Sequence, residues 1–240
     1  DMVGLTTTTD SLVAIRRAVY EERLLSLAEL RDVLDSDWEG REDLRLYFLR
    51  RLPKFGNDDP EADAMAAGEL DRVNRHVRSH RTVFGGPWGV DVIGWSGALE
   101  LGRHTGATPD GRRRGESLAD CAGPAQGRNA CGLTATLNSV LKLPHDHVHG
   151  PLVLSLRFPP GAVTGTGGVK RLRAVVETYF RGGGQDLQIS IAGTDEMKAA
   201  REHPEAHRDL MVRIGGFSAY FVHLDPAFQD DMIARSEAAV

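Results

Sequence analysis

The feature that most constrains the fold is a Gly-Gly pair at positions 215–216, which lies between two short apolar runs in residues 212–224. Glycine adopts positive φ at little cost, and a Gly-Gly pair between apolar runs is a common signal for a β-hairpin. The pattern alone therefore predicts a strand, a tight turn and a second strand. Any fold for this chain has to place that hairpin near the C-terminus.

The residues around the glycine pair carry further information. Arg213 precedes the pair, an aromatic residue and Ser218-Ala219 follow it, and residues 229–235 read Gln-Asp-Asp-Met-Ile-Ala-Arg. This stretch resembles the C-terminal signature of the glycyl radical enzymes, in which Arg-Val-Ala-Gly-Tyr-Ser-Ala precedes a Gln-rich helix. The resemblance identifies Gly216 as the catalytic residue that bears the radical.

A glycine suits this chemistry because an α-carbon radical is stabilised when the carbon is planar and conjugated with both neighbouring amide groups. A β-carbon would crowd that geometry, and glycine has none. Gly216 is preferred because the register from Arg213 to Ala219 holds without a gap. Gly215 stays open as the alternative, since three positions depart from the strictest family pattern: Met211, Gly215 and Phe217.

Length and composition limit the classes of function. The chain has 240 residues, 41% of them hydrophobic, which is enough for a sizeable core. A net charge of −5 gives no electrostatic case for binding nucleic acid. No apolar run is long enough for a membrane span and no signal peptide is recognisable, so we expect a cytoplasmic protein. Because the chain opens with Asp1, we expect it to be part of a longer protein.

Four helices are expected in the first 80 residues. Asp10 is a suitable N-cap for a helix over residues 10–23, and a Ser-x-x-Glu capping box begins the next helix at Ser26. Residues 42–50 are predicted to form the third helix. The fourth should run over residues 60–80, since it begins with a proline that follows capping residues.

Residues 82–132 are rich in Gly, Pro, Arg and Asp, with little periodicity, and such long irregular stretches are usually functional or disordered. Three blocks in this part of the chain also resemble blocks of the glycyl radical enzymes: residues 105–112, 116–120 and 132–143. Leu133 departs from that pattern, where the family usually has proline. The resemblance runs over nearly the whole chain.

The C-terminal part has the pattern of an α/β structure. Apolar runs at residues 152–158 and 187–192 flank an amphipathic helix over residues 169–180. Such a βαβ unit is expected to have parallel strands. A short helix, a strand over residues 210–214 and a final helix after Pro226 should follow.

The resemblance implies a fold and a division of the chain. The expected fold class is α/β, as the C-terminal half of a ten-stranded α/β barrel with an inward glycine loop. Residues 1–106 would be the helical end of a pyruvate formate-lyase-like domain. Residues 107–240 would be the glycine radical domain.

The resemblance also implies the chemistry. In the family, an activating enzyme that uses S-adenosylmethionine and an iron–sulfur cluster removes a hydrogen atom from the glycine. The glycyl radical takes a hydrogen atom from a cysteine, and the thiyl radical attacks the substrate. We therefore expect part of a lyase or dehydratase for a small hydroxylated or amine-bearing substrate, with its catalytic cysteine upstream of this chain. A homodimer is expected, with no bound cofactor and no metal.

Other chemistry-bearing residues have simpler interpretations. Cys121 and Cys131 are too few for a disulfide framework, and each is interpreted as a small, partly buried side chain. The histidines of residues 145–149 are interpreted as part of a surface loop and not as metal ligands. The arginines of residues 112–114 are interpreted as a solvated, locally paired turn.

Three other functions stay open. The first is a stand-alone spare-part protein that carries a glycyl radical and restores a damaged enzyme, although the helical first 80 residues argue against it. The second is a pyruvate formate-lyase-like acyltransferase. The third is a plain α/β binding domain without radical chemistry.

Overall fold

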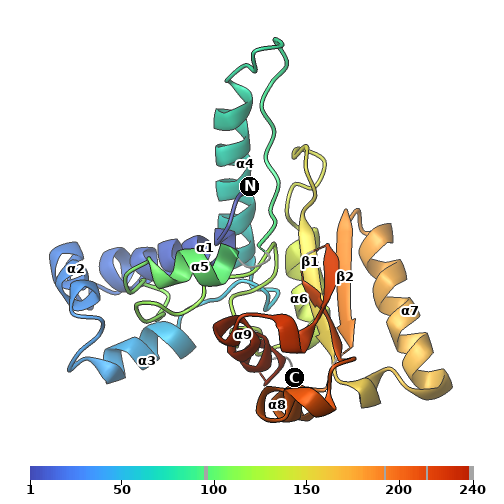
Figure 1. The fold of residues 1–240 in the computed structure, drawn as a ribbon. Coiled ribbons are helices and arrows are strands. Elements are labelled where there is room, and N and C mark those ends of the chain that lie inside the picture. Colours follow the sequence, from blue (N-terminus) through green and yellow to red (C-terminus); the bar gives the residue numbers. More distant parts are fainter. Residues whose placement is uncertain (95–96, 192, 215, 238–240) are drawn as a thin grey trace.

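The computed structural model describes residues 1–94, 97–191, 193–214 and 216–237. Figure 1 shows a helical part, formed by the first four helices, beside a part in which short strands lie among helices. Within the described residues, no helix is long and apolar enough to cross a membrane. The elements are α1 (Leu5–Ile15), α2 (Leu27–Asp35), α3 (Glu42–Arg50), α4 (Pro60–Arg78), α5 (Gly97–Arg103), α6 (Gly132–Leu141), β1 (Val153–Phe158), α7 (Gly165–Arg181), β2 (Asp186–Ile191), α8 (Thr194–Glu202), β3 (Met211–Ile214), β4 (Phe217–Tyr220) and α9 (Pro226–Glu237).

Helices α2, α3 and α4 begin where the sequence predicted, and local capping signals account for the starts of α2 and α4. The capping box of α2 is formed, with the Ser26 hydroxyl accepting from the Glu29 backbone N–H at 3.2 Å. Helix α3 has the predicted bounds. Helix α4 begins at Pro60, and the Asp59 carboxylate accepts from the first backbone N–H groups.

Helix α1 begins earlier than the sequence predicted. It starts at Leu5 and continues as a π-helical turn over Arg16–Glu21. Asp10 therefore lies inside the helix and not at its N-cap, with its side chain buried. Its Oδ1 accepts a hydrogen bond from the Phe55 backbone N–H at 2.8 Å. Burial raises the pKa of the Asp10 carboxyl, and the Lys54 ammonium partly opposes that rise.

The predicted βαβ unit is confirmed, with β1 and β2 parallel and α7 between them in the chain. Leu154 and Leu156 lie on one face of β1 and belong to the main hydrophobic core, together with Val140 of α6 and Tyr179 of α7. Alternate residues of a strand point to opposite faces, so the other face carries polar side chains. Ala192, the expected end of the second strand, lies outside the described residues.

Strands β3 and β4 form a separate antiparallel hairpin, as the sequence predicted. The hairpin packs with α8 and α9 around its own hydrophobic cluster, which includes Met197, Val212, Phe221 and Met232. The described strands thus form two two-stranded sheets. The α/β class is confirmed at that level, and the ten-stranded barrel stays a prediction.

Arg112 organises the irregular stretch that contains α5. Its guanidinium donates hydrogen bonds to the backbone carbonyls of Thr105, Gly106 and Glu116, and its side chain is buried. A guanidinium carries five N–H donors, so it satisfies carbonyls that have no partner in a helix or sheet. The interpretation of Arg112 as a solvated residue was wrong, whereas Arg113 is paired with Glu42 near the surface at 2.6 Å.

An arm formed by the end of α4 and the chain that follows it projects from the rest of the molecule (Figure 1). The turn at its tip is closed by a hydrogen bond from the Thr82 N–H to the Gly86 carbonyl at 2.8 Å. Val83 and Phe84, at this tip, are 94% and 96% exposed. Large apolar side chains exposed to that degree favour association.

We expect the isolated chain to associate in solution. Two features favour association. Val83 and Phe84 are exposed at the tip of the arm. The outer edge of β2 also has no strand partner within the described residues, and unpaired edges favour further pairing. Replacing Val83 and Phe84 together by serine should lower the association, measured as the concentration dependence of the sedimentation coefficient. Val169→Ser, which removes another exposed valine on α7, is the matched control. A compact monomer at every concentration would contradict this prediction.

Candidate functional site

Gly216 lies in the turn between β3 and β4. Ile214 and Phe217 are paired across the two strands, so the turn is tight. The φ angle of Gly216 is +90°, in the region that only glycine adopts without strain. A Cβ added there would meet no atom within 4 Å, so the backbone conformation and not the available space requires glycine. Gly215, the alternative radical residue, lies outside the described residues.

The strand leading into the turn is amphipathic. Val212 and Ile214 are buried in the cluster with α8 and α9, whereas Met211 and Arg213 are exposed. This alternation anchors the base of the hairpin and leaves its tip at the surface. Gly216 is accordingly exposed in this chain, where the resemblance had implied an inward loop.

A hydrogen bond connects the glycine turn to the parallel sheet. The Gly216 backbone N–H donates to Oε1 of Gln188, on β2, at 3.2 Å. Sequence analysis did not single out Gln188. The signal was present, because residues 186–191 alternate polar and apolar side chains, which places Gln188 on the polar face of the strand together with Ser190.

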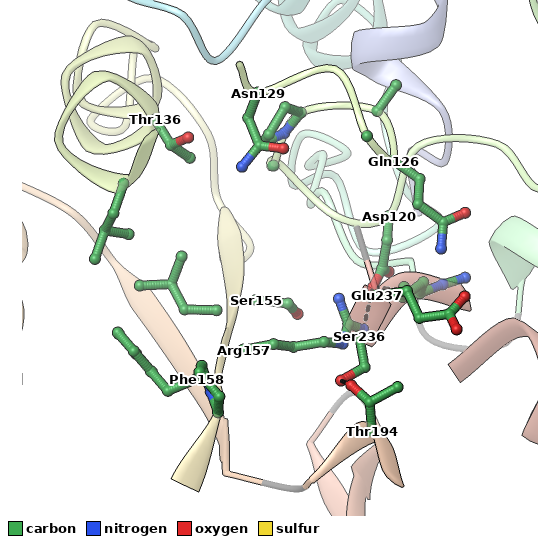
Figure 2. Close-up of a pocket in the computed structure, with 18 of the residues that line it drawn as sticks. Asp120, Gln126, Asn129, Thr136, Ser155, Arg157, Phe158, Thr194, Ser236 and Glu237 are labelled. Atoms are coloured by element: carbon green, nitrogen blue, oxygen red, sulfur yellow. Dashed lines mark hydrogen bonds and ion pairs between the residues drawn. The ribbon is translucent and has the colours of Figure 1, made fainter. Parts of the chain in front are cut away.

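A cavity of about 560 Å³ lies beside β1 and is lined by Ser155, Leu156, Arg157 and Phe158 of that strand. Figure 2 shows Arg157 reaching from β1 toward Asp120, with Asn129 and Thr136 on the opposite wall. The C-terminal end of α9 closes one side through Arg235. The lining is mixed, since apolar residues such as Leu133, Leu156 and Phe158 alternate with the polar groups.

Two guanidinium groups share one carboxylate at the wall of this cavity. Arg235 lies 2.7 Å from Oδ2 of Asp120, and Arg157 lies 3.7 Å from the same atom. A second carboxylate, that of Asp231, is 2.6 Å from Nε of Arg235. Burial lowers the pKa of the Arg157 guanidinium, and repulsion from Arg235 adds to that effect.

Adjoining clefts lead from this cavity to the glycine turn. A smaller cleft has Arg157 and Arg235 in common with the cavity and is lined further by Gln188 and Arg213. A third groove shares Gln188 and Arg213 with that cleft and reaches Gly216. The polar face of the β1–β2 sheet therefore forms a continuous wall from the cavity to the predicted radical residue.

The two cysteines differ from each other and from the sequence interpretation. Cys121 is buried, and burial with the neighbouring Asp120 carboxylate raises its thiol pKa to about 12. Its sulfur accepts a hydrogen bond from the Gly94 N–H at 3.3 Å. Cys131 is exposed, so its interpretation as a partly buried side chain was wrong.

The histidines of residues 145–149 also differ from one another in burial. His147 lies at the surface, with its Nδ1 3.0 Å from the Asp71 carboxylate, as expected for a surface loop. His145 is buried instead, and its Nε2 lies 2.9 Å from the Val140 carbonyl. Burial lowers the pKa of His145 and favours its neutral form. Nowhere in residues 1–94, 97–191, 193–214 and 216–237 do three His, Cys, Asp or Glu side chains cluster in a way that would hold a metal ion.

Two family models match the chain. The one described as "Pyruvate formate lyase-like" matches residues 1–102. The one described as "Glycine radical" matches residues 118–222, a range that includes the hairpin and the cavity-lining β1.

Characterised proteins are similar to the chain along almost its full length. It is 33% identical to (2S)-3-sulfopropanediol dehydratase from Klebsiella oxytoca, over 98% of this chain and 29% of that protein. It is 32% identical to trans-4-hydroxy-L-proline dehydratase from Clostridioides difficile, over 98% and 30% of the two chains. The chain thus spans less than a third of the length of these relatives.

A solved structure is similar as well. The glycerol-bound form of the B12-independent glycerol dehydratase from Clostridium butyricum superposes with a TM-score of 0.91 at 34% identity. The match covers 97% of this chain and 30% of that one.

The difference between the two thiols predicts selective alkylation. With iodoacetamide at about pH 8, where an ordinary thiol is partly ionised, Cys131 should react in the native protein. Cys121 should react only after unfolding, because it is buried and its pKa of about 12 leaves almost no thiolate. Peptide mass spectrometry measures both sites. Equal native rates for the two cysteines would disprove the burial of Cys121.

Proposed function

This chain belongs to the glycyl radical enzymes, and from that premise we propose that it is the radical-storage portion of a lyase or dehydratase, with Gly216 bearing the radical. The observation that carries the assignment is the Arg213 to Ala219 motif, folded as a hairpin whose turn holds Gly216 at φ +90°. A Cβ built on Gly216 would have no heavy atom within 4 Å apart from its chain neighbours. The backbone of the turn therefore has space to rotate from φ +90° toward the extended geometry that a planar, conjugated radical needs.

We assign the thiyl-bearing cysteine to a part of the enzyme upstream of this chain. Cys121 is buried, and its sulfur accepts a hydrogen bond from the Gly94 backbone N–H. Cys131 is exposed. Neither cysteine lines the cavity on β1 or the clefts that lead to Gly216. In this proposal, the polar wall carrying Arg157 faces the space in which an upstream cysteine loop meets substrate and glycine.

The reaction class follows from the relatives, whose names are those of dehydratases and lyases. We therefore assign the enzyme a small hydroxylated substrate, with an amine-bearing one as the alternative. The residues up to 106 would end the pyruvate formate-lyase-like domain, and residues 107–240 would form the glycine radical domain. An activating enzyme that uses S-adenosylmethionine and an iron–sulfur cluster would generate the radical. The assembly would be a cytoplasmic homodimer.

The central test is electron paramagnetic resonance after anaerobic activation. The protein, treated with S-adenosylmethionine, a reductant and the activating enzyme of a relative such as the Clostridium butyricum glycerol dehydratase, should show a glycine-centred radical. Gly216→Ala should abolish the signal, because a methyl group crowds the planar radical and strains φ +90°. Exposure to air should then cleave wild-type chain near Phe217. A signal that survives in Gly216→Ala and disappears in Gly215→Ala would move the radical to Gly215.

A second test concerns the thiols. In a full-length enzyme that carries this chain, replacing Cys121 and Cys131 by serine should leave turnover within severalfold of wild type per radical formed. Serine at the buried site costs stability on the order of 1 to 3 kcal/mol if its hydroxyl goes unpaired, so turnover has to be normalised to radical content. Loss of turnover in the Cys131 variant alone, with the Gly216 radical intact, would place the catalytic thiol in this chain.

A further inference from the structure

We propose that Gln188 is a positioning residue for Gly216: its side-chain carbonyl oxygen accepts a hydrogen bond from the backbone N–H of the radical residue and so holds it in place. The inference rests on the proposed function, in that Gly216 is taken as the radical site. It goes further by assigning a role to a residue of a different strand. The observation that carries it is the 3.2 Å contact from the Gly216 N–H to Oε1 of Gln188.

The contact is well placed to control the turn. Among the described residues, it is the only hydrogen bond between β2 and the hairpin of residues 211–220. The base of the hairpin is held independently, by a hydrogen bond from the Phe221 N–H to the Leu210 carbonyl at 2.8 Å and by the buried cluster around Val212. The hairpin can therefore form without Gln188, and the Gln188 hydrogen bond orients only its tip.

The position of Gln188 is itself well determined. It lies in the middle of β2, paired with Ser155 of β1 in the parallel ladder. The neighbouring residues Leu187 and Ile189 point to the opposite face, where Leu187 packs against the main core. Because the strand is fixed on that side, the Gln188 amide projects from a rigid support, which is the requirement for holding a reactive group in place.

The chemistry of a glycyl radical makes the orientation of its amide important. The unpaired electron on the α-carbon is stabilised by conjugation with the amide nitrogen and with the carbonyl, so both groups have to lie in one plane with that carbon. At φ +90° the Gly216 amide is turned out of that plane, so it has to rotate when the radical forms. A hydrogen bond to the N–H fixes the direction of the amide and hence of the Cα–H bonds. A side-chain carbonyl also polarises the N–H bond and increases electron donation from nitrogen toward the radical centre.

The side chain at position 188 also stands where the clefts meet. Gln188 lines both the cleft shared with Arg157 and the groove that reaches Gly216. The hydrogen bond therefore connects the glycine to the wall that runs toward the larger cavity. Without it, φ +90° at Gly216 would still be allowed, but the turn would sample several orientations.

Two substitutions at position 188 distinguish the effect of the acceptor oxygen from the effect of side-chain length. Gln188→Met keeps the length and removes the carbonyl. Gln188→Glu keeps an acceptor oxygen at the same distance from the backbone. Ser190→Ala, two residues further on the same face of β2 and without a hydrogen bond to the hairpin, is the control for a general disturbance of the strand.

The first measurement needs no radical. In protein labelled with ¹⁵N-glycine, the Gly216 amide resonance is the one that disappears in Gly216→Ala. In Gln188→Met this amide should shift upfield and exchange with solvent about 2- to 10-fold faster, the range that one net hydrogen bond supports. Ser190→Ala should leave it near its wild-type position, and Gln188→Glu, whose carboxylate is a stronger acceptor, should keep the amide protected and at or downfield of that position. If the chemical shift and exchange rate of the Gly216 amide are unchanged in Gln188→Met, with the protein still folded by circular dichroism, the proposed hydrogen bond is absent in solution and the proposal is wrong.

The second measurement uses the activated protein. Gln188→Met should give a glycyl radical with an altered α-proton hyperfine coupling and a shorter lifetime, whereas Gln188→Glu should restore both. Identical spectra and lifetimes in Gln188→Met and wild type would overturn the positioning role. The wild-type amide resonance can show the hydrogen bond while no radical forms in this protein under conditions that activate a related enzyme. In that case the proposed function is wrong. The positioning role then fails with it, and the hydrogen bond is structural only.

Discussion

The parallel pairing of β1 with β2 is the interaction on which the rest of the site depends. Its register places Ser155 opposite Gln188 and Leu154 opposite Leu187, so the small sheet has one polar and one apolar face. The apolar face is part of the main core with α6 and α7. The polar face carries Arg157 and Gln188 and forms the wall between the cavity and the glycine turn. A shift of one residue would exchange the two faces and remove that wall.

The second organising contact is electrostatic. Asp120, in the loop before α6, pairs with Arg235 near the end of α9, and Arg235 pairs in turn with Asp231. Removing one partner from such a cluster leaves a charge without compensation, which is strongly destabilising where the charge is buried. Here the arrangement joins the C-terminal cluster, which contains the glycine hairpin, to the loop that lines the cavity. The hairpin is thereby held at its base by packing, through α9 by charge, and at its tip by Gln188.

The successful and failed predictions differ in how far apart the interacting residues lie. The capping box of Ser26 and the start of α4 at Pro60 were predicted because both partners lie within a few residues. Aspartate is a common N-cap residue, yet the Asp10 carboxylate accepts from the Phe55 backbone N–H, 45 residues away. Arg112 looked like one of three solvated arginines, and only the fold brings the carbonyls that bury it within reach. Cap statistics and charge patterns describe local partners, and they fail where a distant backbone group supplies a better one.

The sequence by itself determined the family, the βαβ unit with parallel strands, the hairpin at the glycine pair and Gly216 as the candidate radical residue, since each depends on residue types at short, fixed spacing. Only the tertiary structure decided what surrounds that glycine. The cavity beside β1, the shared carboxylate of Asp120 and the contact from Gln188 join residues that are 28 or more positions apart. Such contacts depend on strand register and on the packing of α9, and no local pattern encodes either of them.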